Sequence, residues 1–183
     1  MPEPHRRPRL PAVGLAVLMA LATPAPAPAE GGGTSGAAPA AVGPVTHLPL
    51  PRFVSLRGEG ANARRGPNLD QRVDWEFVRR GMPLEVTAEY GNWRRVRDFE
   101  GQGGWVHQAL LSGTRTAVIV AAGPVELRDA PEPGSRVVAV AEPGVIGRLA
   151  ACQGAWCELS AGGSQGWLPR ATLWGVGPDE TLE

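Results

Sequence analysis

From residue 54 onward the apolar residues form short β-branched or aromatic runs with no sustained helical period, and in places they alternate with polar residues. Leu84, Val86 and Ala88, for example, alternate with two glutamates and a threonine. An alternation of this kind is typical of a strand with one face in the core. The bulky apolar runs are short and are separated by Gly and Pro, which excludes long helices. The pattern predicts an all-β fold made of short strands.

Turn residues between these runs predict an antiparallel meander. Tyr90-Gly91-Asn92 can turn the chain, and residues 93–98 can then run back beside the first strand. A second Gly-containing turn over 99–103 precedes Trp105-Val106. A sheet this small hides its edges best by curling closed, so we expect a barrel of five strands.

The same pattern returns 62 to 64 residues later. Trp93 matches Trp156, and Gly104-Trp105-Val106 matches Gly166-Trp167-Leu168. Landmarks that recur in order over this length predict a tandem repeat. The expected barrels span 52–113 and 114–176, and residues 177–183 form a C-terminal tail.

The N-terminal region has a different composition. Residues 1–29 combine a basic start, an apolar stretch and a small-residue A-x-A site, which predicts a signal peptide cleaved near Ala29. A retained membrane anchor is the alternative, but the apolar stretch is short for a bilayer span. Residues 30–51 are rich in Gly, Ala and Pro, which predicts a disordered linker. The mature chain is then expected to be periplasmic or secreted, with no membrane span.

The charge balance narrows the choice of partners. The chain carries 18 basic and 18 acidic residues, and every basic residue is an arginine. A nucleic-acid-binding domain normally presents an excess of basic residues. We therefore expect no nucleic-acid partner.

Two motifs of the first repeat resemble those of the bacterial SH3-like (SH3b) domains. Asn62-Ala63-Arg64-Arg65-Gly66-Pro67 is similar to the family's N-x-R-x-G-P, and Gly101-Gln102-Gly103-Gly104-Trp105-Val106 to its G-x-x-G-W-V. The whole looks like a tandem SH3b protein of the proteobacterial cell envelope. The resemblance implies two small barrels and a binding role, often associated with peptidoglycan or with envelope hydrolases.

This resemblance leads to an expectation of a non-catalytic module that recognises peptidoglycan or a wall-associated partner. A structural protein-protein adaptor of the periplasm is the alternative. An enzyme is not expected, because His107 is the one histidine of the predicted barrels and has no evident catalytic partner. No cofactor is expected either.

The two cysteines are expected to form a disulfide. Cys152 and Cys157 flank four residues with turn character, so a hairpin there would place their Cβ atoms opposite each other. An exported protein favours the bond. One cysteine pair without further ligands is too few for zinc, so no metal site is predicted.

Ligand contacts are predicted on the first barrel, where aromatic and basic residues gather near the turn of residues 90–92. A shallow groove of this composition would suit a peptide or an acidic segment. The alternative is that the arginines lie on a solvated strand face and that the repeated tryptophans pack the barrels. The candidate ligand-binding residues are Trp75, Tyr90, Asn92, Trp93, Arg95 and Arg97.

Overall fold

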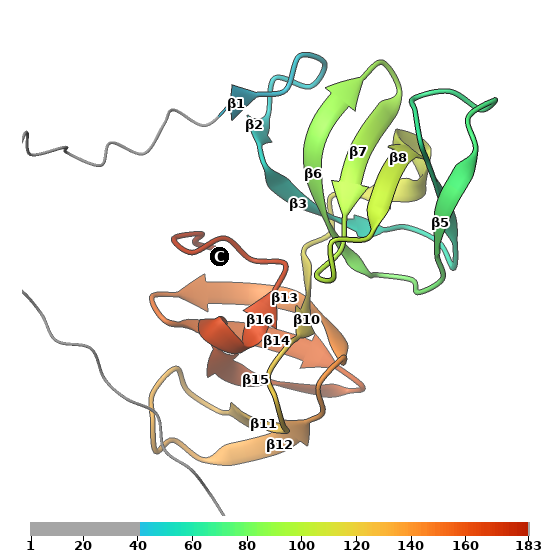
Figure 1. Ribbon diagram of the computed structural model, residues 1–183. Helices are drawn as coiled ribbons and strands as arrows, with labels where there is room; N and C mark the ends of the chain where they lie inside the picture. The colour runs from blue at the N-terminus through green and yellow to red at the C-terminus, as the bar shows by residue number, and fades with distance from the viewer. Residues whose placement is uncertain (1–40, 183) are drawn as a thin grey trace, which may run out of the picture. The chain divides into compact units, whose positions relative to one another are not determined.

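The computed structural model describes residues 41–182, almost entirely as strands and turns (Figure 1). The predicted signal peptide, its cleavage site near Ala29 and residues 30–40 of the predicted linker lie outside the described residues. Within 41–182, no helix is long and apolar enough to cross a membrane.

The first barrel is an antiparallel sheet of seven strands, in the spatial order β5-β4-β8-β7-β6-β3-β9. A single 3-10 turn, η1, joins the last two strands in sequence. The elements are β3 (Arg52–Leu56), β4 (Ala61–Arg64), β5 (Val73–Phe77), β6 (Pro83–Tyr90), β7 (Trp93–Arg97), β8 (Gly103–His107), η1 (Gln108–Leu110) and β9 (Leu111–Ser112).

The second barrel repeats this topology strand for strand, in the order β12-β11-β15-β14-β13-β10-β16. Its elements are β10 (Thr116–Ile119), β11 (Val125–Arg128), β12 (Val137–Ala141), β13 (Ile146–Gln153), β14 (Trp156–Ala161), β15 (Ser164–Pro169), η2 (Arg170–Thr172) and β16 (Leu173–Trp174). The prediction of an all-β tandem repeat is confirmed. Each sheet has seven strands rather than five, because closing pairs as short as Leu111–Ser112 leave no alternating pattern in the sequence.

Each barrel has its own core of aliphatic side chains. Phe77, Leu84 and Val86 are buried in the first barrel, and Leu159 and Leu168 in the second. None of the tryptophans is fully buried. The repeated tryptophans therefore line the surface of the barrels more than they fill the interior.

A β-bulge changes which side chains of β6 face inward. The pairing of β6 with β7 shifts between Val86 and Ala88, so the strict alternation expected from the sequence ends at Thr87. Beyond the bulge Ala88 is half-buried, whereas Glu89 is 6% exposed. The bulge therefore turns a carboxylate, predicted on the solvent face, toward the interior. An equivalent bulge in β13 directs Cys152 inward.

The structure differs from the predicted linker over residues 41–50. Strands β1 (Ala41–Val42) and β2 (Pro49–Leu50) pair as a small hairpin, and β2 contacts β6 (Figure 1). Leu50 is buried in the core of the first barrel. This part of the segment is richer in bulky apolar residues than residues 30–40, so it has surface to bury.

Candidate functional site

A groove of about 330 Å³ opens on the first barrel between β4, the loop that follows it, β7 and η1. Its lining combines one indole ring with amide, carboxylate, guanidinium and imidazole groups. These side chains belong to Asn62, Arg64, Glu76, Trp93 and His107.

The aromatic wall of this groove is a cross-strand pair. Trp93 of β7 lies opposite His107 of β8, and their rings meet edge to face with centroids 5.5 Å apart. The His107 Nδ1 accepts a hydrogen bond from the backbone N–H of Ala109 at 3.3 Å, which caps η1. The imidazole is therefore held by the turn on one side and by the indole on the other.

The polar wall comes from the outward face of β4 and β5. Asn62 pairs in register with Glu76, and both side chains are exposed. Their neighbours Ala61 and Ala63 are buried, so alternation along β4 directs Asn62 and Arg64 away from the core.

Arg64 of the N-x-R-x-G-P motif holds the loop beside the groove. Its Nη1 donates to the carbonyl oxygens of Leu69 at 2.9 Å and Gln71 at 2.7 Å. In the second barrel the equivalent Arg128 donates from Nη1 to the carbonyl of Ser135 at 2.6 Å. The motif arginine therefore holds the loop that follows its strand through hydrogen bonds to backbone carbonyls in both copies.

The second barrel has a groove of about 580 Å³ in the corresponding place, lined by Arg128 and Trp156 among others. Its polar groups are fewer. The strand registers place Val140 where the first barrel has Glu76, and Pro169 where it has His107. The first groove therefore offers more hydrogen-bonding side chains to a ligand than the second groove does.

The structure does not bring the six predicted ligand-binding residues into one site. Of these six residues, Trp93 lines the groove of the first barrel and the other five do not. Trp75 and Tyr90 are 39% and 64% exposed and lie outside it, and Asn92 accepts a hydrogen bond from Gln108 Nε2 at 3.1 Å.

Arg95 and Arg97 lie elsewhere, on a hollow of about 310 Å³ bordered by the turn after β7. The Arg97 guanidinium forms an ion pair with Glu85. The positions of these two arginines agree better with the alternative that they lie on a solvated strand face than with the hypothesis that they line a ligand groove.

A second polar cluster surrounds Glu89, and sequence reasoning missed it. Glu89 Oε2 accepts from the backbone N–H of Val45 at 3.0 Å and of Thr46 at 2.9 Å, and Oε1 accepts from Thr46 Oγ1 at 2.6 Å. Oε1 also accepts from Arg52 Nη2 at 2.7 Å and lies 3.6 Å from Arg94 Nε. We call these five residues the Glu89 clasp.

Electrostatics of the clasp favour an ionised carboxylate. Burial would raise the pKa of Glu89, but the hydrogen bonds from Thr46, Arg52 and Val45 lower it to about 2. A Cβ at Gly43 would lie 2.4 Å from Glu89 Oε2, so the loop needs glycine there to approach. The sequence signal that could have indicated this clasp is the group of bulky apolar residues within 45–50, in a segment otherwise rich in Gly, Ala and Pro.

The disulfide occupies the equivalent position of the second barrel. Cys152 lies opposite Cys157, one pair before the two-residue turn, as Glu89 lies opposite Arg94 in the first barrel. Their Cα atoms are 4.1 Å apart and the sulfurs are bonded, so the predicted disulfide is confirmed. The turn is tighter than expected, because Gln153 already pairs with Trp156.

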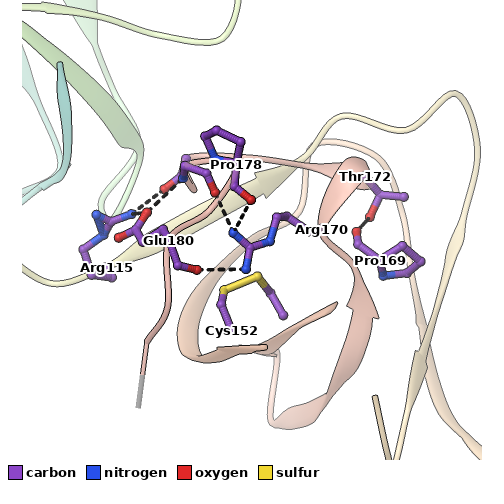
Figure 2. The surroundings of a disulfide bond; sticks show 10 residues. Arg115, Cys152, Pro169, Arg170, Thr172, Pro178 and Glu180 are labelled. Carbon is purple, nitrogen blue, oxygen red and sulfur yellow. Dashed lines mark hydrogen bonds and ion pairs between the residues drawn. A yellow bond between two sulfur atoms is a disulfide. The ribbon is translucent and has the colours of Figure 1, made fainter. Parts of the chain in front are cut away.

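The C-terminal tail covers this disulfide (Figure 2). The carbonyl of Leu182 accepts from the backbone N–H of Cys152 at 3.0 Å. The Arg170 guanidinium binds the carbonyls of Gly177, Pro178 and Glu180 at 2.7, 2.9 and 2.8 Å, as the dashed lines toward it show. An N-terminal segment thus closes the first barrel and a C-terminal segment closes the second at the same place.

No group of His, Cys, Asp or Glu side chains that could hold a metal ion is found in the part of the chain that the structure describes.

Two solved structures from Trichomonas vaginalis, those of NlpC2 and NlpC1, each share 12% identity with this chain at a TM-score of 0.32. The match covers 68% and 72% of this chain but 48% of each of those chains, so this chain spans about half their length. The curated proteins contain no significant match.

The profile of the bacterial SH3 domain matches residues 57–113 and again residues 121–175. The two matches together cover more than half of the sequence and coincide with the two barrels. The chain therefore belongs to the bacterial SH3 domain family and carries two tandem copies of the domain.

Proposed function

We propose that this protein is a non-catalytic, exported binding module that recognises peptidoglycan through the groove of the first barrel. One observation carries the proposal. The first groove surrounds Trp93 with the hydrogen-bonding side chains of Asn62, Glu76 and His107. The second groove has proline or valine in place of two of them.

The chemistry of the groove suits a wall peptide. Peptide stems offer amides, small aliphatic side chains and ammonium groups. The Glu76 carboxylate can pair with an ammonium group, the Asn62 amide can donate to and accept from a peptide bond, and the indole of Trp93 can cover an aliphatic side chain. A concave, part-aromatic surface with a few polar groups is typical of a ligand site.

Two further observations support a location outside the cytoplasm. The Cys152–Cys157 disulfide is typical of proteins that fold in an oxidising compartment. Membership of the bacterial SH3 domain family points the same way. Together with the basic and apolar N-terminal sequence, they favour a periplasmic or secreted protein.

The test is a pulldown of the purified protein with isolated peptidoglycan sacculi. The variant is Asn62→Ala with Glu76→Gln, because both side chains are exposed and their replacement leaves the core intact. The matched control is Trp75→Ala with Tyr90→Ala, which removes exposed aromatic area outside the groove. Circular dichroism checks that all three proteins are folded.

We expect the wild type and the control to bind sacculi and the groove variant to bind about tenfold more weakly. Absence of binding by the wild type would overturn the wall-binding proposal in favour of a protein partner. Equal binding by the groove variant would place the site elsewhere on the molecule.

A further inference from the structure

Strand β12 is an edge strand that lacks the charged residues and the proline that commonly prevent pairing. It lies at the end of the second sheet and pairs with β11 on one side. Its sequence is Val-Val-Ala-Val-Ala, with no charged residue and no proline. Val137 and Val140 are 40% and 61% exposed. Free N–H and C=O groups beside exposed valines form a template for another strand.

The equivalent edge of the first barrel is protected. Strand β5 has the sequence Val-Asp-Trp-Glu-Phe, and its two carboxylates discourage strand addition. Both edges carry a β-bulge at the same place, opposite Arg64 and Arg128, so the bulge does not distinguish them. The charges do distinguish them: the carboxylates of β5 discourage pairing with another strand, and the uncharged β12 permits it.

We propose that β12 pairs in antiparallel register with β12 of a second copy of this chain. The strand is close to a palindrome about Ala139. A two-fold axis at Ala139 places Val138 opposite Val140 of the second copy, and Val137 opposite Ala141. An isologous contact of this kind closes as a dimer and leaves no further edge to extend.

Charge complementarity at the strand ends selects this register. The same axis places Arg136 of each copy opposite Glu142 of the other, which gives two reciprocal ion pairs. Both side chains are exposed. Within residues 41–182, Glu142 has no ion-pair partner, and Arg136 has only an exposed contact with Asp129 at 3.1 Å. Pro143 follows directly and ends the ladder.

A single strand pair is a small interface, so we expect a weak dimer with a dissociation constant of about 100 µM. Sedimentation equilibrium of the purified protein between about 10 µM and about 1 mM measures it across this range. The informative variants are Glu142→Arg and Arg136→Glu. Each places two like-charged pairs across the proposed axis.

The expected result is a dimer for the wild type and dimerisation about tenfold weaker for each single variant. An equimolar mixture of the two variants restores association, because the heterodimer again has only opposite charges across the axis. Glu132→Arg makes the same charge change in an exposed loop and leaves the dimer unchanged. A wild type that stays monomeric, or a mixture that associates no better than the single variants, overturns the proposal.

Discussion

The Glu89 carboxylate and the Thr46 hydroxyl lie 2.6 Å apart although 43 positions separate them in sequence. Glu89 is on a strand of the first barrel, and Thr46 is in the hairpin loop that precedes that barrel. The contact makes the segment before the barrel part of its fold. The family profile begins only at residue 57, so this addition lies outside the matched domain.

Replacement of Glu89 by Gln should destabilise the first barrel by about 3 kcal/mol, because the buried Arg94 and the partly buried Arg52 then lose their counter-charge. The amide also brings N–H donors toward the donors of Val45 and Thr46. Denaturant unfolding followed by tryptophan fluorescence measures the change. Glu59→Gln, at an exposed position, is the matched control and should change stability by less than about 0.5 kcal/mol.

The free energy of unfolding of the wild type should decrease in acid, and the pKa of Glu89 sets the pH range over which it decreases. Its pKa is about 2 in the folded protein against an ordinary value of 4.5. A lowered pKa stabilises the fold above the unfolded-state value, and this contribution is lost as the pH falls from about 4.5 toward about 2. The loss amounts to about 3 kcal/mol.

Unfolding free energies measured at several pH values across this range should therefore converge for the wild type and Glu89→Gln. A constant difference between the two proteins would show that the carboxylate is not ionised in the folded state.

Removal of the disulfide by Cys152→Ala with Cys157→Ala should cost about 2 kcal/mol on the chain-entropy model. The tail should also loosen, because Leu182 hydrogen-bonds to the backbone of Cys152. Thermal unfolding of the variant, and of the wild type with and without reductant, measures the first effect, and amide exchange at position 152 measures the second. The clasp of the first barrel should be unaffected, so unchanged exchange at Thr46 is the internal control.

Replacement of Arg64 by Lys should loosen the loop beside the first groove without unfolding the barrel. The lysine side chain is one atom shorter, so its ammonium group does not reach the position from which Arg64 Nη1 binds the carbonyls of Leu69 and Gln71, and we expect a loss of about 1 kcal/mol. Amide exchange in residues 65–72 should become about tenfold faster. Arg128→Lys should have the same effect on residues 129–136 only, and an effect on both loops would contradict a local role.

The repeat and the fold class could be predicted because they depend on patterns that recur. Trp93 and Trp156, with the Gly-Trp pairs that follow, mark the same strands in both copies. The disulfide could be predicted because a short hairpin leaves its two cysteines few other arrangements.

The Glu89 clasp and the groove could not be predicted, for reasons of geometry. Alternation places Glu89 in solvent, and only the bulge at Thr87 turns it inward. The groove joins Asn62 and Glu76 to Trp93 and His107 through β4 and β8, which are far apart in sequence and adjacent only in the sheet. Candidates chosen by proximity along the chain, such as Tyr90 and Arg95, were consequently distributed over different surfaces.

The equivalence of the Glu89–Arg94 and Cys152–Cys157 positions has a consequence for the tandem as a whole. Two identical copies of a domain are stabilised by the same contacts, so a change in pH or redox conditions that destabilises one copy also destabilises the other. Here a charged contact stabilises this position in the first copy, and a covalent bond between two adjacent strands stabilises it in the second. Protonation leaves the sulfur bridge intact, and a reductant leaves the carboxylate intact. Divergence at this one position therefore means that acid weakens this contact in the first barrel alone, and that a reductant breaks it in the second barrel alone.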